Sequence, residues 1–261
     1  VTAKPRAGNA APRVVEVRAG MLNAIGLANI GLDRFLADKP AELASLGCPV
    51  VANVAGHTIE DYVTVCRALD RCSVISALEL NVSCPNVADG MVFGTDPGGL
   101  LELTAAVREV TRRCTLIVKL SPNVTDIAAT AAAAIDGGAD ALSLVNTFMG
   151  MAIDIEKRRP ILANRTGGLS GPAIKPLALR MVDQVYRAVA RDRNIPLIGM
   201  GGIASAADAI EFILAGASAI AVGTALFVDP ATPARINAGL ADYLHRHNIP
   251  ALRDLVGRLA G

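Results

Sequence analysis

Short apolar runs and longer amphipathic segments alternate along most of this chain. Apolar runs bounded by turn residues predict buried strands, at residues 49–54, 77–82, 115–120, 141–145, 196–200 and 219–222. The segments between them predict helices, at about residues 58–71, 97–112, 125–136, 173–190, 205–215 and 233–247. Strands that alternate with helices form βαβ units on a parallel sheet, which makes the fold class α/β.

The first 46 residues follow a different pattern. A short strand is predicted at residues 13–17. The apolar stretch 21–31 is interrupted by Asn23, Gly26 and Asn29, so it predicts a loop that presents backbone and amide groups rather than a helix. Residues 32–46 have a helical pattern.

Six βα units fit two architectures, a doubly wound sheet or an incomplete barrel. A doubly wound sheet concentrates its ligands at one switch point, whereas here polar residues end nearly every predicted strand. The last two units also look like the paired phosphate-binding loops of a barrel. The preferred prediction is a TIM (β/α)8 barrel with about six of its eight units present, as a single domain over residues 1–261 that is incomplete at its N-terminus.

Composition narrows the class of protein. Hydrophobic residues make up 52% of the chain, which excludes disorder, and the net charge of +1 gives no electrostatic reason to expect nucleic acid. The sequence contains no apolar run of membrane-spanning length and no signal peptide, so we expect a cytoplasmic protein. The five cysteines are scattered without a C-x-x-C pair, which predicts reduced thiols and no metal or iron–sulfur site in this chain.

Two glycine-rich strand ends predict phosphate binding. Gly201 and Gly202 follow one strand and precede Ser205–Asp208, which opens a helix; Gly223 and Thr224 follow the next strand. Glycines let a backbone approach a phosphate, and helix N-termini offer unpaired N–H groups. The alternative is that these glycines only make tight turns, but two adjacent loops in this order favour phosphate.

Polar residues end several other strands. Lys119 closes an apolar strand and needs a partner or a ligand there, unless it extends into solvent at the barrel mouth. Converging amides would suit a flat heterocycle rich in C=O and N–H groups. Any single asparagine could instead cap a turn. The asparagines of this set are Asn23, Asn53, Asn81, Asn86 and Asn146.

Cys84 is the cysteine that lies in a polar loop at a strand end, so it is the candidate reactive thiol. We expect Cys48, Cys66 and Cys72 to lie in the core or in helices, and no histidine is placed to form a Cys–His pair. The loop from Thr147 to Lys175 is too long for a plain βα connection and predicts a lid or a binding loop.

Together these segments resemble the class 1 dihydroorotate dehydrogenases, in particular the catalytic subunit of the NAD-linked class 1B type. The resemblance runs from about Pro5 to the end. It rests on MLNAIGL, ELNVSCPNV, FGTDP, IVKLSPNVTDI, RPILANRTGGLSGPAIKPLALR, IGMGGI and AVGTALF. The joint occurrence of ELN-x-SCPN, IVKLSPNVTDI and GGLSGPAIKP is highly specific.

This resemblance implies an FMN-dependent oxidation of dihydroorotate to orotate in pyrimidine (UMP) biosynthesis. Cys84 would be the general base that takes a proton from C5 while C6 gives hydride to the flavin. The implied substrate-binding residues are Asn23, Ile25, Gly26, Leu27, Asn81, Asn86, Asn146 and Thr147. The implied FMN-binding residues are Asn53, Lys119, Val145, Gly171, Gly201, Gly202, Gly223 and Thr224.

The resemblance also implies a homodimer that assembles as a heterotetramer with a separate subunit carrying FAD and a [2Fe–2S] cluster, which passes electrons to NAD. Family members have a longer N-terminal segment with further barrel strands and an active-site lysine, which Lys4 does not match in spacing. Two alternatives stay open: a pyrimidine reductase related to dihydropyrimidine dehydrogenase, and a catalytically incomplete flavin-binding fragment.

Overall fold

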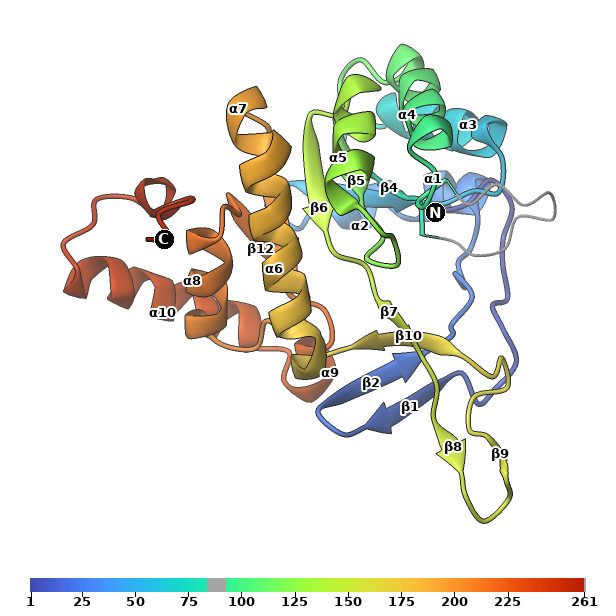
Figure 1. The fold of residues 1–261 in the computed structure, drawn as a ribbon. Coiled ribbons are helices and arrows are strands. Elements are labelled where there is room, and N and C mark those ends of the chain that lie inside the picture. The colour runs from blue at the N-terminus through green and yellow to red at the C-terminus, as the bar shows by residue number, and fades with distance from the viewer. Residues whose placement is uncertain (84–92, 261) are drawn as a thin grey trace. The chain divides into compact units, whose positions relative to one another are not determined.

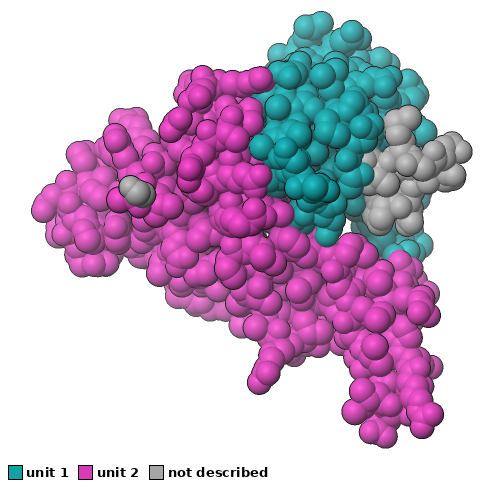
Figure 2. All heavy atoms as spheres, viewed as in Figure 1, with its two compact units in different colours: residues 1–9, 25–142 teal, residues 10–24, 143–261 magenta. Residues whose placement is uncertain are grey.

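The structure is a computed structural model that describes residues 1–83 and 93–260 (Figure 1). The chain divides into two compact units, drawn in teal and magenta in Figure 2. Unit 1 comprises residues 1–9 and 25–142, and unit 2 comprises residues 10–24 and 143–261. The expectation of one barrel domain over the whole chain stays a prediction.

Six strands form the main sheet, in the order β12-β11-β6-β5-β4-β3. They are β3 (Val50–Val54), β4 (Ile75–Asn81), β5 (Thr115–Lys119), β6 (Ala141–Leu144), β11 (Leu197–Met200) and β12 (Ala219–Ala221). The pairs β3–β4, β4–β5 and β11–β12 are parallel. The bounds agree with the six predicted strands to within two residues, which confirms the α/β class.

The helices of unit 1 follow the predicted segments closely. They are α1 (Leu32–Asp38), α2 (Pro40–Ala44), α3 (Ile59–Asp70), α4 (Pro97–Val110) and α5 (Ile127–Asp136). The segment 32–46 forms two helices rather than one, because Pro40 has no backbone N–H and is suited to the first turn of a new helix. Helix α3 begins with a capping box in which Thr58 and Asp61 satisfy each other's backbone N–H groups.

The core of unit 1 lies between the sheet and these helices. Alternate strand residues such as Leu80 and Val118 are completely buried and lie on the opposite face from their neighbours in sequence. Tyr62 of α3 is also buried, and its ring meets Phe93 edge to face with centroids 6.2 Å apart. Burial of this apolar surface is the main stabilising contribution to the unit.

The helices of unit 2 pack around β11 and β12. They are η1 (Pro172–Ile174), α6 (Lys175–Val185), η2 (Tyr186–Ala190), α7 (Arg191–Arg193), α8 (Ala206–Leu214), α9 (Ala225–Val228), α10 (Thr232–Arg246) and η3 (Leu252–Leu255). The buried side chains of Val182, Leu197 and Phe212 belong to this core. Within the described ranges, no helix has both the length and the apolar character needed to cross a bilayer.

Unit 2 also contains an antiparallel sheet that the sequence did not predict. Its order is β1-β2-β10-β7, with β1 (Val14–Val17), β2 (Gly20–Asn23), β7 (Phe148–Gly150) and β10 (Gly167–Ser170). A hairpin of β8 (Ile153–Asp154) and β9 (Arg159–Pro160) extends from it (Figure 1).

The prediction of a loop is therefore wrong for residues 21–23, which belong to β2. The segment 147–175, predicted as a lid or a binding loop, contains the short strands β7, β8, β9 and β10, and its role stays a prediction. The strand predicted at residues 13–17 is β1, which pairs with β2 as a local hairpin. Strand β10 pairs with β2, which is distant in sequence, so no local pattern predicts it.

Candidate active site

Four polar side chains lie on one face of the sheet in unit 1. The register pairs Asn53 of β3 with Glu79 of β4, and Asn81 of β4 with Lys119 of β5. Because strand side chains alternate between faces, residues 79 and 81 share a face, whereas Leu80 between them points into the core. The three predicted residues Asn53, Asn81 and Lys119 are thus brought together at the carboxyl ends of adjacent parallel strands.

Hydrogen bonds fix two of these side chains. The Asn53 amide donates from Nδ2 to Glu79 Oε2 at 2.7 Å. Asn81 Oδ1 accepts from the backbone N–H of Ser83 at 3.4 Å, and the Asn81 carbonyl accepts from the Tyr62 hydroxyl at 2.7 Å. Glu79 was missed by sequence reasoning, although a carboxylate within an apolar strand is the same kind of signal that singled out Lys119.

The loop of Ile25, Gly26 and Leu27 presents its backbone N–H groups. Its three carbonyls accept hydrogen bonds from Asn9 N, Arg6 Nε and Asn29 Nδ2 respectively, at 2.9, 3.3 and 2.8 Å. Among residues 1–83 and 93–260, no hydrogen bond uses the N–H of any of the three. A loop whose carbonyls are satisfied and whose N–H groups are available is suited to binding an anion.

Gly26 must be glycine for a local reason. Its φ is +76°, and a Cβ there would lie 2.7–2.8 Å from atoms of Asn9. Glycine tolerates both the left-handed backbone and the close approach. The apolar stretch 21–31 in which it lies is therefore a strand that ends at Asn23, followed by a tightly packed loop.

In unit 2, the predicted substrate residues Asn23 and Thr147 both lie against Gly168. Asn23 ends β2 opposite Gly168 and donates from Nδ2 to the Gly168 carbonyl at 3.5 Å. A Cβ on Gly168 would lie 2.0 Å from Thr147 Oγ1, so Thr147 packs directly on this backbone. Asn146 Oδ1 accepts from the Thr147 N–H at 2.9 Å, which is a turn-capping role of the kind considered as its alternative.

Four of the predicted cofactor residues also gather within unit 2. A Cβ on Gly202 would lie 2.9 Å from the Gly171 carbonyl oxygen, and a Cβ on Gly171 would lie 3.6 Å from Thr224 Cγ2. The Thr224 hydroxyl is hydrogen-bonded to the Ser170 hydroxyl at 2.7 Å. Gly201 precedes Gly202, and both have positive φ, at +124° and +78°. Val145 is buried beside this strand, with its N–H bonded to the Met200 carbonyl at 3.0 Å.

Backbone donors are available at these loops. In the described part of unit 2, no hydrogen bond uses the N–H of Gly202, Gly223 or Thr224. A Cβ on Gly223 would meet nothing within 4 Å, so this backbone borders open space. Donors beside open space are the arrangement that an anionic group requires.

Part of the start of helix α8, predicted as an anion site at Ser205–Asp208, is occupied by the helix's own cap. Asp208 Oδ2 accepts from the N–H of Ala204 and of Ser205, at 3.0 and 2.9 Å. The Ser205 hydroxyl in turn accepts from the Asp208 N–H at 3.2 Å. This reciprocal cap occupies three of the backbone N–H groups at this helix start. Phosphate binding at Ser205–Asp208 stays a prediction.

Lys175 connects this cap to helix α6. Its Nζ lies 2.8 Å from Asp208 Oδ1 and 2.9 Å from Glu211 Oε1. Burial opposes ionisation of Asp208, but hydrogen bonds from Lys175, Ala204 and Ser205 outweigh it and lower its pKa. The hydrogen bond to Asp208, followed by that to Glu211, raises the pKa of Lys175. The network therefore fixes the base of the Gly201–Gly202 loop against α6.

The predicted base Cys84 and the predicted ligand Asn86 lie outside the described residues. Among the other cysteines, burial raises the pKa of the Cys66 thiol to about 12 and that of Cys114 to about 11, so neither is a reactive thiolate at neutral pH. Cys48 is exposed, which corrects the expectation that it lies in the core or in a helix.

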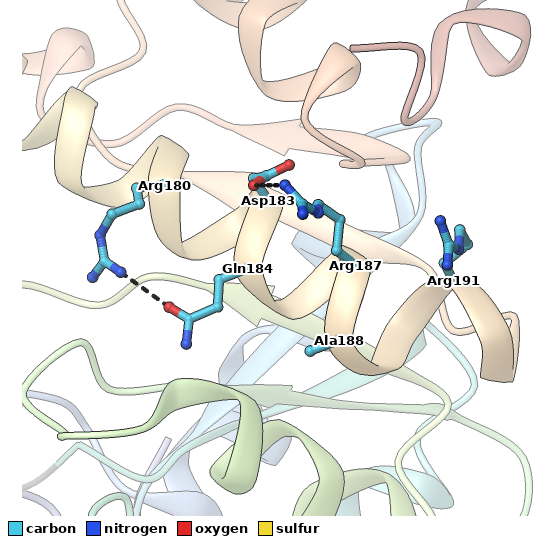
Figure 3. Close-up of a pocket in the computed structure, with 6 residues that line it drawn as sticks. All are labelled: Arg180, Asp183, Gln184, Arg187, Ala188 and Arg191. Carbon is cyan, nitrogen blue, oxygen red and sulfur yellow. Dashed lines mark hydrogen bonds and ion pairs between the residues drawn. The ribbon is translucent and has the colours of Figure 1, made fainter. Parts of the chain in front are cut away.

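A surface hollow on helices α6 to α7 has none of the predicted site residues in its lining. It is lined by Arg180, Asp183, Gln184, Arg187, Ala188 and Arg191 (Figure 3). Arg187 pairs with Asp183 at 3.6 Å, and Arg180 donates to Gln184 at 3.0 Å. Its polar groups pair with each other along one helix, so it offers no catalytic constellation.

The fold and these strand ends define the class of protein: an enzyme built on a (β/α)8 barrel, of which this chain contains six units. Comparison with known proteins gives the family. The model of the family described as dihydroorotate dehydrogenase matches residues 1–244. The chain belongs to the dihydroorotate dehydrogenase family.

Curated relatives are similar over almost the whole chain. Proteins named "Dihydroorotate dehydrogenase B (NAD(+)), catalytic subunit" are 54% identical in Geotalea daltonii and 56% identical in Trichlorobacter lovleyi. These matches cover 98% and 99% of this chain, and 83% and 84% of the two relatives. The relative of that name in Geobacter sulfurreducens is 54% identical.

Proposed function

We propose that this chain oxidises dihydroorotate to orotate in pyrimidine biosynthesis, with FMN as its cofactor. The observation that carries the proposal is the row of Asn53, Asn81 and Lys119 on one sheet face. Neutral amides beside a single cation suit a flat heterocycle that presents both C=O and N–H groups. The names of the curated relatives support the same substrate.

The residues present fit FMN. Available N–H groups at Gly202, Gly223 and Thr224, beside the open space at Gly223, would suit a phosphate group. Asn53, Lys119, Val145, Gly171 and Gly201 complete the set of residues expected to hold the cofactor. When bound, FMN supplies the acceptor for the hydride that the substrate loses.

The substrate residues divide by chemistry. The N–H groups of Ile25, Gly26 and Leu27 would bind the carboxylate of dihydroorotate. The side chains expected to hold the pyrimidine ring are Asn23, Asn81, Asn86, Asn146 and Thr147. Cys84 would take the proton from C5 as general base, a role typically worth 10²–10⁴-fold in rate.

The names of the curated relatives also indicate a partner subunit. The relatives are catalytic subunits of an NAD(+) type, which implies a second subunit. We infer that a subunit with FAD and a [2Fe–2S] cluster passes the electrons to NAD, in a heterotetramer built on a homodimer of this chain. The cytoplasmic location stays a prediction.

Anaerobic flavin reduction tests the proposal on the purified full-length protein. Dihydroorotate should bleach the bound flavin, and Cys84→Ala should slow bleaching about a hundredfold or more while FMN stays bound. Cys48→Ala is the matched control, because Cys48 is an exposed thiol, and it should react at the wild-type rate. Absence of bound flavin, or equal bleaching by dihydrouracil, would contradict the proposal, the latter in favour of a pyrimidine reductase.

A further inference from the structure

Glu79 is the one acidic side chain that the sheet of unit 1 places on the same face as the candidate ligand residues, among the strand residues described. Its register partner is Asn53, and it lies two residues before Asn81 on β4. The neighbours of Glu79 on this face are Ile117 across on β5 and Ala77 along β4, both buried and apolar, whereas Val51 and Thr115 farther down the face are exposed. Packing against Ile117 and Ala77 does not require a carboxylate at this position.

The contact between Glu79 and Asn53 fixes the orientation of an amide. A carboxylate accepts hydrogen bonds and donates none, so the NH₂ group of Asn53 must face Glu79, as the 2.7 Å contact shows. The carbonyl oxygen Oδ1 of Asn53 then faces away from Glu79. A hydrogen bond to a charged acceptor is stronger than one between neutral groups, so it holds this orientation firmly.

We propose that Glu79 is a positioning residue that makes Asn53 a hydrogen-bond acceptor toward the flavin. Asn53 would then receive a hydrogen bond from an N–H or O–H group of FMN. Without Glu79, the amide could rotate and present its NH₂ group to the same donor, which is repulsive. This inference rests on the proposed function, because it assumes that the ligand beside Asn53 is FMN.

A double-mutant cycle on FMN affinity tests the proposal. The flavin-free full-length protein is titrated with FMN, and the dissociation constant is read from quenching of flavin fluorescence. E79A should weaken binding about tenfold or more, as expected for loss of a hydrogen bond to a charged group. E79Q should stay within about threefold of wild type, because the glutamine carbonyl can accept from the same NH₂ group.

The cycle separates action through Asn53 from a direct effect. N53A should weaken binding, and E79A/N53A should be no weaker than N53A alone. Glu102→Ala, which removes an exposed glutamate of α4, is the matched control and should leave the affinity unchanged. If E79A fails to fold, E79M, which keeps the side-chain length without an acceptor, replaces it.

Two outcomes overturn the inference. Additive effects of E79A and N53A would show that Glu79 acts independently of Asn53. Equal losses in E79Q and E79A would show that the charge, and not the orientation of the amide, is what FMN binding requires. Failure of the wild-type protein to bind FMN is a different result, because it removes the proposed function itself.

Discussion

Replacing Asp70 by Asn should destabilise unit 1 strongly, although the two side chains have the same shape. Asp70 ends helix α3, and its carboxylate accepts the backbone N–H groups that precede β5. Oδ1 accepts from Cys114 at 2.8 Å and Arg113 at 3.1 Å, and Oδ2 accepts from Arg112 at 3.1 Å. Asn has a single acceptor oxygen, so in either orientation its NH₂ group faces a backbone N–H.

The magnitude follows from these contacts. Asp70 is 8% exposed, so water replaces the lost hydrogen bonds poorly. Hydrogen bonds to charged groups contribute about 1.5–3 kcal/mol each, and an unsatisfied buried donor costs about 1–3 kcal/mol. We expect a loss of about 3 kcal/mol in the free energy of unfolding. Far-UV circular dichroism in urea is the assay, because the chain contains no tryptophan.

Asp126→Asn is the matched control. Asp126 also accepts backbone N–H groups, from Ala128 and Ala129 at the start of α5, but it is exposed. Asn is as good an N-cap as Asp, so this variant should change the free energy of unfolding by about 0.5 kcal/mol or less.

The dependence on pH provides a second check. Burial alone would raise the pKa of Asp70, but hydrogen bonds from Cys114, Arg112 and Arg113 outweigh burial and lower it. Its contribution is therefore complete above the unfolded pKa of about 3.9 and is lost as pH falls through the lower folded value. The gap between wild type and Asp70→Asn should narrow below about pH 4. A gap under about 1 kcal/mol at pH 7, or one unchanged at pH 3, would refute the reasoning.

Three further predictions use the same methods. Gly223→Ala should change the free energy of unfolding by about 0.5 kcal/mol or less and weaken FMN binding. Gly202→Ala, at a position with φ +78°, should weaken FMN binding and also destabilise the fold by about 1–3 kcal/mol. Equal urea unfolding curves for the two variants would contradict this. Lys175→Met should cost about 1 kcal/mol. Because its hydrogen bond to Asp208 raises the pKa of Lys175, that cost should disappear as pH rises through the raised value, above about 10.4, and its persistence there would argue against the ion pair. Thr58→Ala should cost about 1 kcal/mol in urea unfolding through loss of the α3 capping box, and an unchanged midpoint would exclude that role.

The main sheet could be predicted because its signals are local. Apolar runs such as Leu116–Val118 are buried on β5, and turn residues bound each of them. The antiparallel sheet could not, because Gly167–Ser170 has neither an apolar run nor alternation. Its strand exists through pairing with Gly20–Asn23, far away in sequence. Because Asn23 and Gly26 interrupt the apolar stretch 21–31, the pattern predicts a loop where β2 ends.

Part of the site could have been predicted more sharply. Ser205 followed three residues later by Asp208 is a capping-box spacing, which predicts that side chains of the helix itself occupy some of the N–H groups at the start of α8. Glu79 was equally visible as a charge inside an apolar strand. The hydrogen bond between Glu79 and Asn53 depends on the register of β3 and β4, which cannot be predicted from the sequence. Cys84 and Asn86 remain predictions.

Asp70 and Glu79 show that two carboxylates in unit 1 can have different roles. Asp70 accepts from backbone N–H groups, whose positions define the chain path, so its loss should reduce stability. Glu79 accepts from the Asn53 side chain on a partly exposed face, so its loss leaves the chain path intact. Asp70→Asn should therefore lower stability while the folded protein keeps its FMN affinity. E79A should keep the stability of the wild type and weaken FMN binding. If each of the two variants lost both stability and FMN affinity, the two roles would not be separable.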